Sequence, residues 1–99
     1  MQKTTIDWQA VRKAVLIFRS VNHKLRQKLI DLLEDRDQMK VTEIYIALRL
    51  EQSVASQNLA ILRRSGVVVT ERQGKFIYYS LDKSRLEEIS RIATELAEG

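Results

Sequence analysis

The chain has 99 residues, of which 44% are hydrophobic and 30% are charged, a composition typical of one folded domain with a small core. It contains no cysteine, which excludes disulfides, thiolate metal sites and cysteine-based catalysis or redox sensing. No apolar stretch approaches the ~18 residues needed to cross a membrane, so we expect a cytoplasmic protein with a single domain over residues 1–99.

The net charge of +4 is distributed unevenly along the chain. Residues 1–81 carry 14 Lys and Arg against 8 Asp and Glu, whereas residues 82–99 carry 3 against 5. A basic surface favours a polyanion such as nucleic acid, and the acidic C-terminal segment is poorly suited to contact phosphate. Charge alone is equally compatible with a basic protein that binds no polyanion.

Residues 6–21 are predicted to form a helix that is apolar along two lines at helical spacing. The first line is Trp8, Val11, Val15 and Phe18, and the second is Ala10, Ala14, Ile17 and Val21. A helix that is apolar on two sides must be covered on two sides, so we expect a second subunit to cover one of them. The alternative is one broad stripe on the core of a monomer.

Two more helices are expected before the middle of the chain. Residues 22–34 should form a helix capped by Asn22, with its leucines on one face. The polar residues 35–38 are typical of a turn, and Thr42 is a suitable cap for a short helix over residues 42–49.

A fourth helix is predicted over residues 53–65, and Gly66 follows it where a left-handed residue commonly ends a helix. Its buried face consists of Val54, Ala55, Leu59 and Leu62, with Asn58 at the border. The outward face is unusual because Ser and Asn are mediocre helix formers whose side chains compete for backbone hydrogen bonds. Its residues are Ser53, Ser56, Gln57, Ala60, Arg63 and Arg64.

The pattern then changes to that of a β-hairpin and one last helix. Residues 67–71 and 76–81 are rich in β-branched and aromatic side chains, and residues 72–75 should form the turn between these strands. Ser84 fits a capping box at the start of a helix over residues 84–97. The apolar stripe of that helix is Leu86, Ile89, Ile92, Ala93 and Leu96.

Two short helices followed by a hairpin describe a winged helix-turn-helix, a mainly α fold with a small β-hairpin. In this fold the second helix enters the DNA major groove, which is about 12 Å wide, and its N-terminal side chains meet base edges. Short serines allow a close approach, and Gln57 offers a donor and an acceptor together, the pairing that suits adenine. We expect double-stranded DNA to be contacted by Ser53, Ser56, Gln57, Asn58, Arg63, Arg64, Arg72, Gln73 and Lys75.

Residues 41–81 also resemble the DNA-binding half of the arsenic-repressor (ArsR/SmtB) family of bacterial transcriptional regulators. The matching motifs are Ser53-x-x-Ser56-x-x-Leu59-x-x-Leu62, Arg64-x-Gly66, Gln73-Gly74-Lys75, Tyr78-Tyr79-x-Leu81 and, upstream, Arg26-x-x-Leu29-Ile30-x-x-Leu33. The resemblance implies a homodimer built by the first and last helices, which binds an imperfect inverted repeat, usually to repress transcription. The dimer interface would then include Trp8, Val11, Val15, Phe18, Ile89, Ile92, Ala93 and Leu96.

The chain departs from this family at the positions that sense metals. Many members carry a cysteine pair in the helix that reads TEIYIAL at residues 42–48 here, and others use Asp and His on the last helix, where Lys83, Arg85 and Leu96 stand. In the first stretch, Ile44, Tyr45 and Ile46 cannot ligate a soft metal, and in the last helix two cations and an apolar side chain do not suit a metal ion. His23 is the only histidine and has no second ligand nearby in the sequence. We therefore expect no metal site, no cofactor and no thiol sensing.

Several alternatives stay open at this point. A winged helix can serve as a protein-interaction module without specific DNA binding, since a fold does not fix a function. Catalysis is disfavoured because the chain lacks a paired nucleophile and base and a glycine-rich phosphate loop. Trp8 and Tyr45 are compatible with the border of an apolar ligand pocket or with core packing, and either Tyr78 or Tyr79 is the buried one. The sequence identifies no effector.

Overall fold

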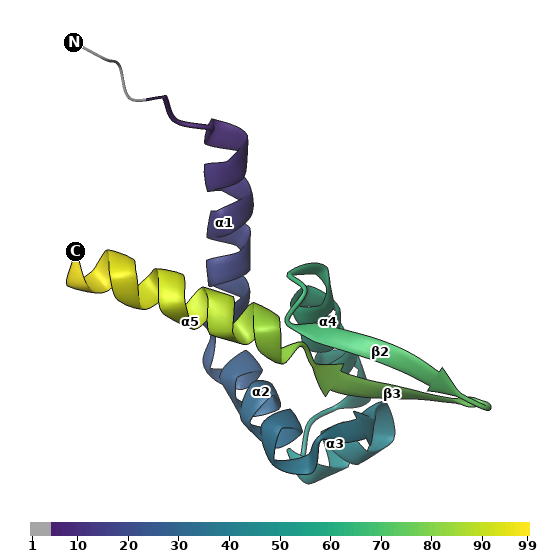
Figure 1. Ribbon diagram of the computed structural model, residues 1–99. Coiled ribbons are helices and arrows are strands. Elements are labelled where there is room, and N and C mark those ends of the chain that lie inside the picture. Colours follow the sequence, from purple (N-terminus) through teal and green to yellow (C-terminus); the bar gives the residue numbers. More distant parts are fainter. Residues whose placement is uncertain (1–4) are drawn as a thin grey trace.

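Within residues 5–99, which the computed structural model describes, the chain forms five helices and three strands (Figure 1). Their order is α1 (Trp8–Val21), α2 (Lys24–Arg36), β1 (Gln38–Lys40), α3 (Val41–Ala47), α4 (Gln52–Arg64), β2 (Val68–Gln73), β3 (Phe76–Leu81) and α5 (Lys83–Glu98). The strands form one antiparallel sheet in the order β1-β3-β2. This is the winged helix-turn-helix that the sequence predicts, with the β2–β3 hairpin as the wing.

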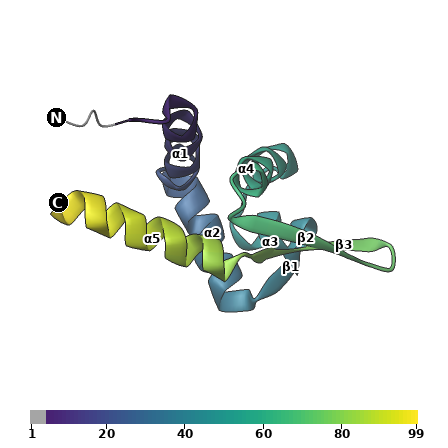
Figure 2. The same ribbon diagram turned by 45° about the horizontal axis from the view of Figure 1, so that its top comes forward.

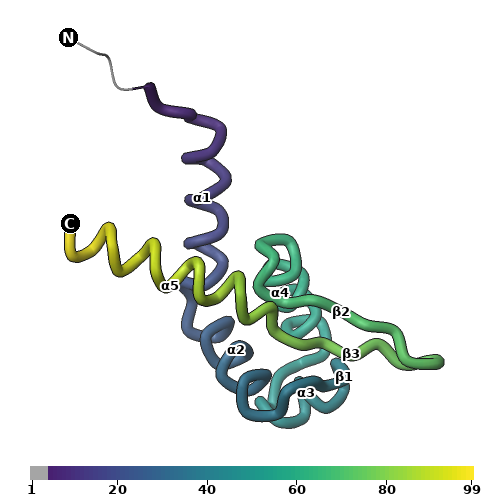
Figure 3. The backbone as a smooth tube through the Cα atoms, viewed as in Figure 1, coloured from purple at the N-terminus to yellow at the C-terminus, as the bar shows by residue number. Residues whose placement is uncertain are grey.

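The core lies where α2, α3 and α4 pack against the base of the sheet. The largest side chains of this core are almost completely shielded from solvent and come from every part of this body: Leu29, Leu33, Ile44, Leu59, Leu62, Val67 and Val68. By contrast, α1 and α5 extend away from the body, so the molecule measures 59 × 26 × 22 Å (Figure 2). The end of α5 and the tip of the wing lie at opposite ends of the molecule (Figure 3).

The junction between α4 and the wing is a Schellman motif, as the position of Gly66 predicts. Gly66 has a φ of +79°, its N–H donates to the Arg63 carbonyl at 3.1 Å, and the Val67 N–H donates to the Leu62 carbonyl at 3.0 Å. This pair of bonds satisfies carbonyls at the end of the helix that would otherwise have no partner. It turns the chain from α4 directly into β2.

The first strand, β1, was not expected, because residues 35–38 were predicted to be a turn. Asp37, with a φ of +70°, makes the turn, and the next three residues pair with β3 through Met39 opposite Tyr79. Met39 is buried in the core. A three-residue strand with two polar members carries no periodic signal, so only its pairing with distant residues reveals it.

Three predicted helix caps are wrong. Asn22 still donates its N–H to α1, so the cap of α2 is His23, whose Nδ1 accepts from the Leu25 N–H at 3.2 Å. Likewise, α3 begins one residue before Thr42, and the Glu43 carboxylate accepts from the Lys40 N–H at 2.9 Å.

At the start of α5, Asp82 replaces Ser84 as the cap, and its carboxylate accepts from the Arg85 N–H at 3.1 Å. Asp82 also donates its own N–H to the Val67 carbonyl at 2.9 Å. This bond to the base of β2 holds Asp82 extended, so the helix starts immediately after it.

The hairpin is longer and tighter than predicted. Gln73 pairs with Phe76, so Arg72 and Gln73 belong to β2 and the turn consists only of Gly74 and Lys75. Gly74 has a φ of +64° and Lys75 does not have a positive φ, which defines a type II′ turn. Along β3, Tyr79 packs against the core while Tyr78 lies on the opposite face of the sheet.

Candidate nucleic-acid interface

The polar face of α4 is the first component of the candidate interface. Leu59 and Leu62 are buried on one side of this helix and hold it against the body. The opposite side is solvent-exposed, and we call it the polar face of α4; it consists of Ser53, Ser56, Gln57, Arg63 and Arg64. The structure thus brings five of the nine expected DNA-contacting residues together on one helix surface.

Asn58 differs from the other predicted DNA-contacting residues of α4, because its amide is already bonded within the chain. Its Nδ2 donates to the Val54 carbonyl at 2.8 Å, and its Oδ1 accepts from Arg26 Nη1 at 3.0 Å. The Asn58 side chain is half-buried at the edge of α4. The side chain therefore attaches α4 to α2, and its expected contact with DNA stays a prediction.

Arg26 links three helices, a role that its place in a sequence motif does not reveal. Besides Asn58 on α4, its guanidinium donates through Nε to the Ser20 carbonyl at 2.6 Å and through Nη2 to the Arg19 carbonyl at 3.3 Å. These two carbonyls lie in the last turn of α1, where a cation is also favoured by the helix dipole. Arg26 is therefore half-buried and directed at these partners, whereas the two nearby lysines, Lys24 and Lys28, are exposed.

The wing is the second component, and its three expected contacts are all exposed near the tip. Arg72 donates from Nε to the Gly74 carbonyl at 3.2 Å, which holds the guanidinium beside the turn. Gln73 donates from Nε2 to Gln38 Oε1 at 3.3 Å. Lys75 lies at the tip with its Nζ 5.4 Å from the centre of the Phe76 ring.

Lys40 is a basic residue of the wing region that the sequence analysis missed. Its Nζ lies 4.4 Å from the centre of the Phe76 ring. The Phe76 ring therefore makes cation–π contacts with Lys40 from β1 and with Lys75 from the turn. No local signal could have found this cluster, because β1 was not predicted and Lys40 is distant from Phe76 in the sequence.

The predicted dimer faces are largely uncovered in the single chain. On α1, Trp8 is 62% exposed, and Val11 and Val15 are also exposed. On α5, Leu96 is 73% exposed, and Ile92 and Ala93 are half-buried. Apolar side chains at such exposure along two projecting helices are typical of an interaction surface.

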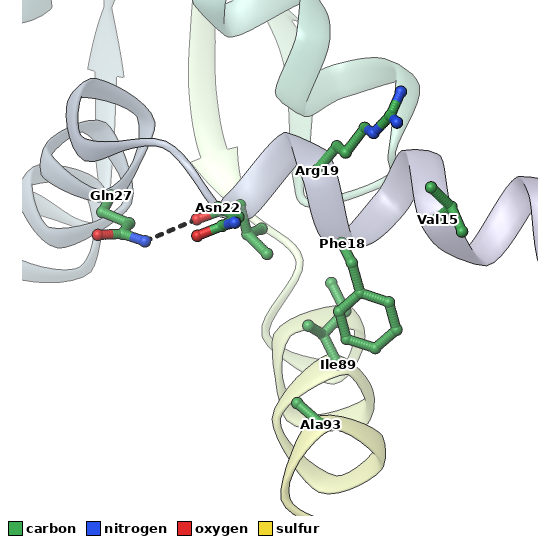
Figure 4. Close-up of a pocket in the computed structure, with 8 residues that line it drawn as sticks. Val15, Phe18, Arg19, Asn22, Gln27, Ile89 and Ala93 are labelled. Carbon is green, nitrogen blue, oxygen red and sulfur yellow. Dashed lines mark hydrogen bonds between the residues drawn. The ribbon is translucent and has the colours of Figure 1, made fainter. Parts of the chain in front are cut away.

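Two of the expected interface residues already have partners within the chain. Phe18 points from α1 toward α5, beside Ile89, in a hollow that Ala93 and Val15 also line (Figure 4). Ile89 is only 8% exposed and belongs to the core. Most of the Ile89 side chain is thus already covered within the chain, because α5 crosses the end of α1 at this point, and its place in the dimer interface stays a prediction.

Residues 23–70 match the family of bacterial regulatory proteins called the arsR family. The chain is 30% identical to the transcriptional repressor PagR of Bacillus anthracis, over 88% of this chain and 87% of PagR. The chain belongs to the arsR family. A winged helix-turn-helix forms its centre, and the family to which it belongs consists of transcriptional regulators.

The similarity extends to three-dimensional structure. The crystal structure of PagR superposes with a TM-score of 0.71 at 29% identity, covering 88% of this chain and 99% of PagR. An activator is also similar: HlyU of Vibrio cholerae is 30% identical over 85% of this chain and 77% of HlyU. A homodimeric winged helix-turn-helix domain from Mycobacterium bovis shares the fold, with a TM-score of 0.76 at 21% identity over 99% of this chain and 92% of that domain.

No group of three or more His, Cys, Asp and Glu side chains within residues 5–99 is placed to hold a metal ion. Likewise, no helix in the described part of the chain is both long and apolar enough to cross a bilayer.

Proposed function

We propose that this member of the arsR family acts as a homodimeric repressor that recognises an inverted repeat in double-stranded DNA. The observation that carries the proposal is the division of α4 into a buried apolar side and an exposed side of Ser, Gln and Arg. A helix with this exposed side, held by a core and followed by a basic wing, has the dimensions and chemistry of a major-groove reader.

Base selectivity is assigned to the N-terminal half of the polar face of α4. Ser53 and Ser56 are short enough to let the backbone approach the bases, and Gln57 can pair with adenine through a donor and an acceptor. None of these three side chains makes a hydrogen bond within residues 5–99 that would have to break first. Asn58 is excluded from this set because Arg26 holds it.

Affinity is assigned to the cations around this helix. Arg63 and Arg64 lie at the end of α4, and Arg72, Lys75 and Lys40 lie on or beside the wing. Contacts of this kind with phosphate supply most of the affinity of a DNA-binding protein and make it depend on salt. In this proposal Gln73 stabilises the wing near its tip, because its amide donates to the Gln38 side chain on β1.

Dimerisation is assigned to the exposed apolar residues of α1 and α5. A second copy that covers Trp8, Val11, Val15 and Leu96 would remove apolar surface that a single chain leaves in water. The Mycobacterium bovis domain that shares the fold is a homodimer, which supports assembly of this chain as a dimer. Two-fold symmetry would place the two α4 helices in successive major grooves, about 34–36 Å apart.

The signal that releases DNA is proposed not to be a metal or a thiol oxidant. The chain has no cysteine and one histidine, and that histidine uses Nδ1 to cap α2. If a signal does release the DNA, that signal must therefore act through chemistry other than metal binding or thiol oxidation.

The test is selection of bound fragments from a pool of random DNA at about 150 mM salt. We expect a palindrome to be enriched, with half-site centres one helical turn apart. A matched control is the Ser53→Glu, Gln57→Glu double variant. Both positions are exposed, so the fold should be kept, but the two carboxylates should repel the DNA phosphates and abolish the enrichment. Enrichment of no palindrome, together with an affinity that does not change with salt, would instead support a protein-interaction module.

A further inference from the structure

A groove of about 470 Å³ lies between α1 and α4, on the opposite side of α1 from the hollow beneath α5. We call it the α1–α4 groove. Residues 13, 16, 17 and 20 of α1 line it, whereas residues 15, 18, 19, 21 and 22 line the other hollow. At 3.6 residues per turn, Ile17 points to the side of α1 opposite Trp8, whereas Leu16 lies roughly 80° around the helix from Trp8. The groove is therefore centred on the side of α1 that faces away from Val15 and Phe18 of the proposed dimer face.

The floor of the α1–α4 groove is apolar. Leu16 and Ile17 of α1 and Ile61 of α4 line it, and Leu16 is 64% exposed. The two serines of the groove have satisfied hydroxyl groups, because Ser20 donates to the Ile17 carbonyl at 2.6 Å and Ser65 donates to the Leu62 carbonyl at 2.9 Å. The floor therefore offers apolar contact and no competing hydrogen-bond donor.

The rim of the groove is cationic. Lys13 of α1 and Arg64 of α4 line it from both sides, and no acidic residue does. Neither side chain takes part in an ion pair found within residues 5–99. Two such cations beside an apolar floor complement a ligand that has an anionic head and an apolar body.

We propose that the α1–α4 groove binds a small organic acid, a carboxylate on a short apolar chain, whose head lies between Lys13 and Arg64. The volume of the groove lies within the range of small-molecule sites, about 300–1,000 Å³. The apolar chain covers Leu16, which otherwise stays in water.

Binding of this acid would weaken the binding of DNA, and this step rests on the proposed function. Arg64 is assigned there to a DNA phosphate, and it cannot neutralise that phosphate while it neutralises the carboxylate. The ligand and the DNA therefore compete for one guanidinium, which is a negative coupling between two sites and must act in both directions.

The experiment compares three probes with the same chain and different heads, octanoate, 1-octanol and octylamine, by calorimetry on the full chain. We expect octanoate to bind about tenfold more tightly than octanol, the effect of two partly exposed charge pairs, and octylamine to bind more weakly than octanol. Equal affinity for octanoate and octanol would overturn the proposal.

Variants locate the binding site. Arg64→Met and Lys13→Met should each reduce the tenfold difference between octanoate and octanol to about threefold, whereas Arg12→Met, on the same helix but outside the groove, should preserve it. Leu16→Gln should weaken both probes. All four positions are exposed, so folding is expected to survive, as circular dichroism would verify. Unchanged octanoate binding in Arg64→Met would overturn the assignment.

The DNA step is measured separately, without and then with octanoate. Octanoate should lower the DNA affinity of the wild type and have no effect on that of Arg64→Met. Octanoate binding without any DNA binding would refute the proposed function and still support the groove as a ligand site. Normal DNA binding without octanoate binding would refute only the proposal that the groove binds an organic acid. Dissociation of the dimer by Leu16→Glu would show that a second copy of the chain covers the groove instead.

Discussion

The central body and the two outer helices use their apolar side chains in opposite ways. In the body, formed by α2, α3, α4 and the sheet, residues such as Leu62 are completely shielded, and the exposed side of α4 is mainly polar. On α1 and α5, Trp8 and Leu96 are mostly exposed, and Ser20 is the only buried residue of α1. The difference indicates that the body folds around its own core, whereas the outer helices expose apolar surface that a second copy would cover in the proposed dimer.

The largest effect should come from the core of the body. Leu62→Ala removes a side chain that is 0% exposed and should lower the free energy of unfolding by about 2–5 kcal/mol, through lost transfer energy and a cavity. Ile46→Ala is the control, because Ile46 is 68% exposed in the same body, and it should change stability by less than about 0.5 kcal/mol. Urea unfolding measures both; equal losses would contradict the assignment of the core.

The outer helices should respond in assembly rather than in folding. Trp8→Ala should weaken the dimer by about 2 kcal/mol, or roughly 30-fold in the dissociation constant, if Trp8 is a central anchor of the interface. Analytical ultracentrifugation measures this change, and circular dichroism should show an unaltered helix content. A variant that dimerises like the wild type would show that the second copy binds elsewhere.

Two positions on α4 should separate base reading from phosphate binding. Gln57→Ala should cost about 1–3 kcal/mol on the preferred DNA sequence and relax the choice of base. Arg64→Ala should weaken binding to every sequence and reduce the salt slope by about 2, one phosphate contact from each subunit. Fluorescence titrations at several salt concentrations distinguish them, and uniform losses in both variants would refute this division.

The smallest effect separates two neighbours on α4. Asn58→Ala deprives Arg26 of an acceptor at 3.0 Å and should lower stability by about 1–2 kcal/mol. Gln57→Ala should leave stability within about 0.5 kcal/mol, because Gln57 is exposed. If thermal unfolding shows no difference between the two variants, the link from α2 to α4 contributes little to the body.

Much of the interface could be predicted because it depends on local periodicity. The spacing of Leu59 and Leu62 identified the buried side of α4, and hence which of its polar side chains are exposed. Gly66 marked the end of that helix because few other residues adopt a positive φ without cost. The two strands of the wing followed from their β-branched and aromatic residues, although their exact ends did not.

The remaining features depend on contacts between residues that are far apart in the sequence. Met39 is a strand residue only because Tyr79 lies opposite it, and Asp82 is a cap only because the Val67 carbonyl holds it. The same reason governs Asn58, whose place at the edge of α4 was evident but whose partner, Arg26, is 32 residues away. The sequence by itself determined the elements and their exposed faces, since these follow from neighbours within one or two turns. Only the tertiary structure decided which polar side chains remain available to DNA, because burial and hydrogen bonding between distant segments select among them.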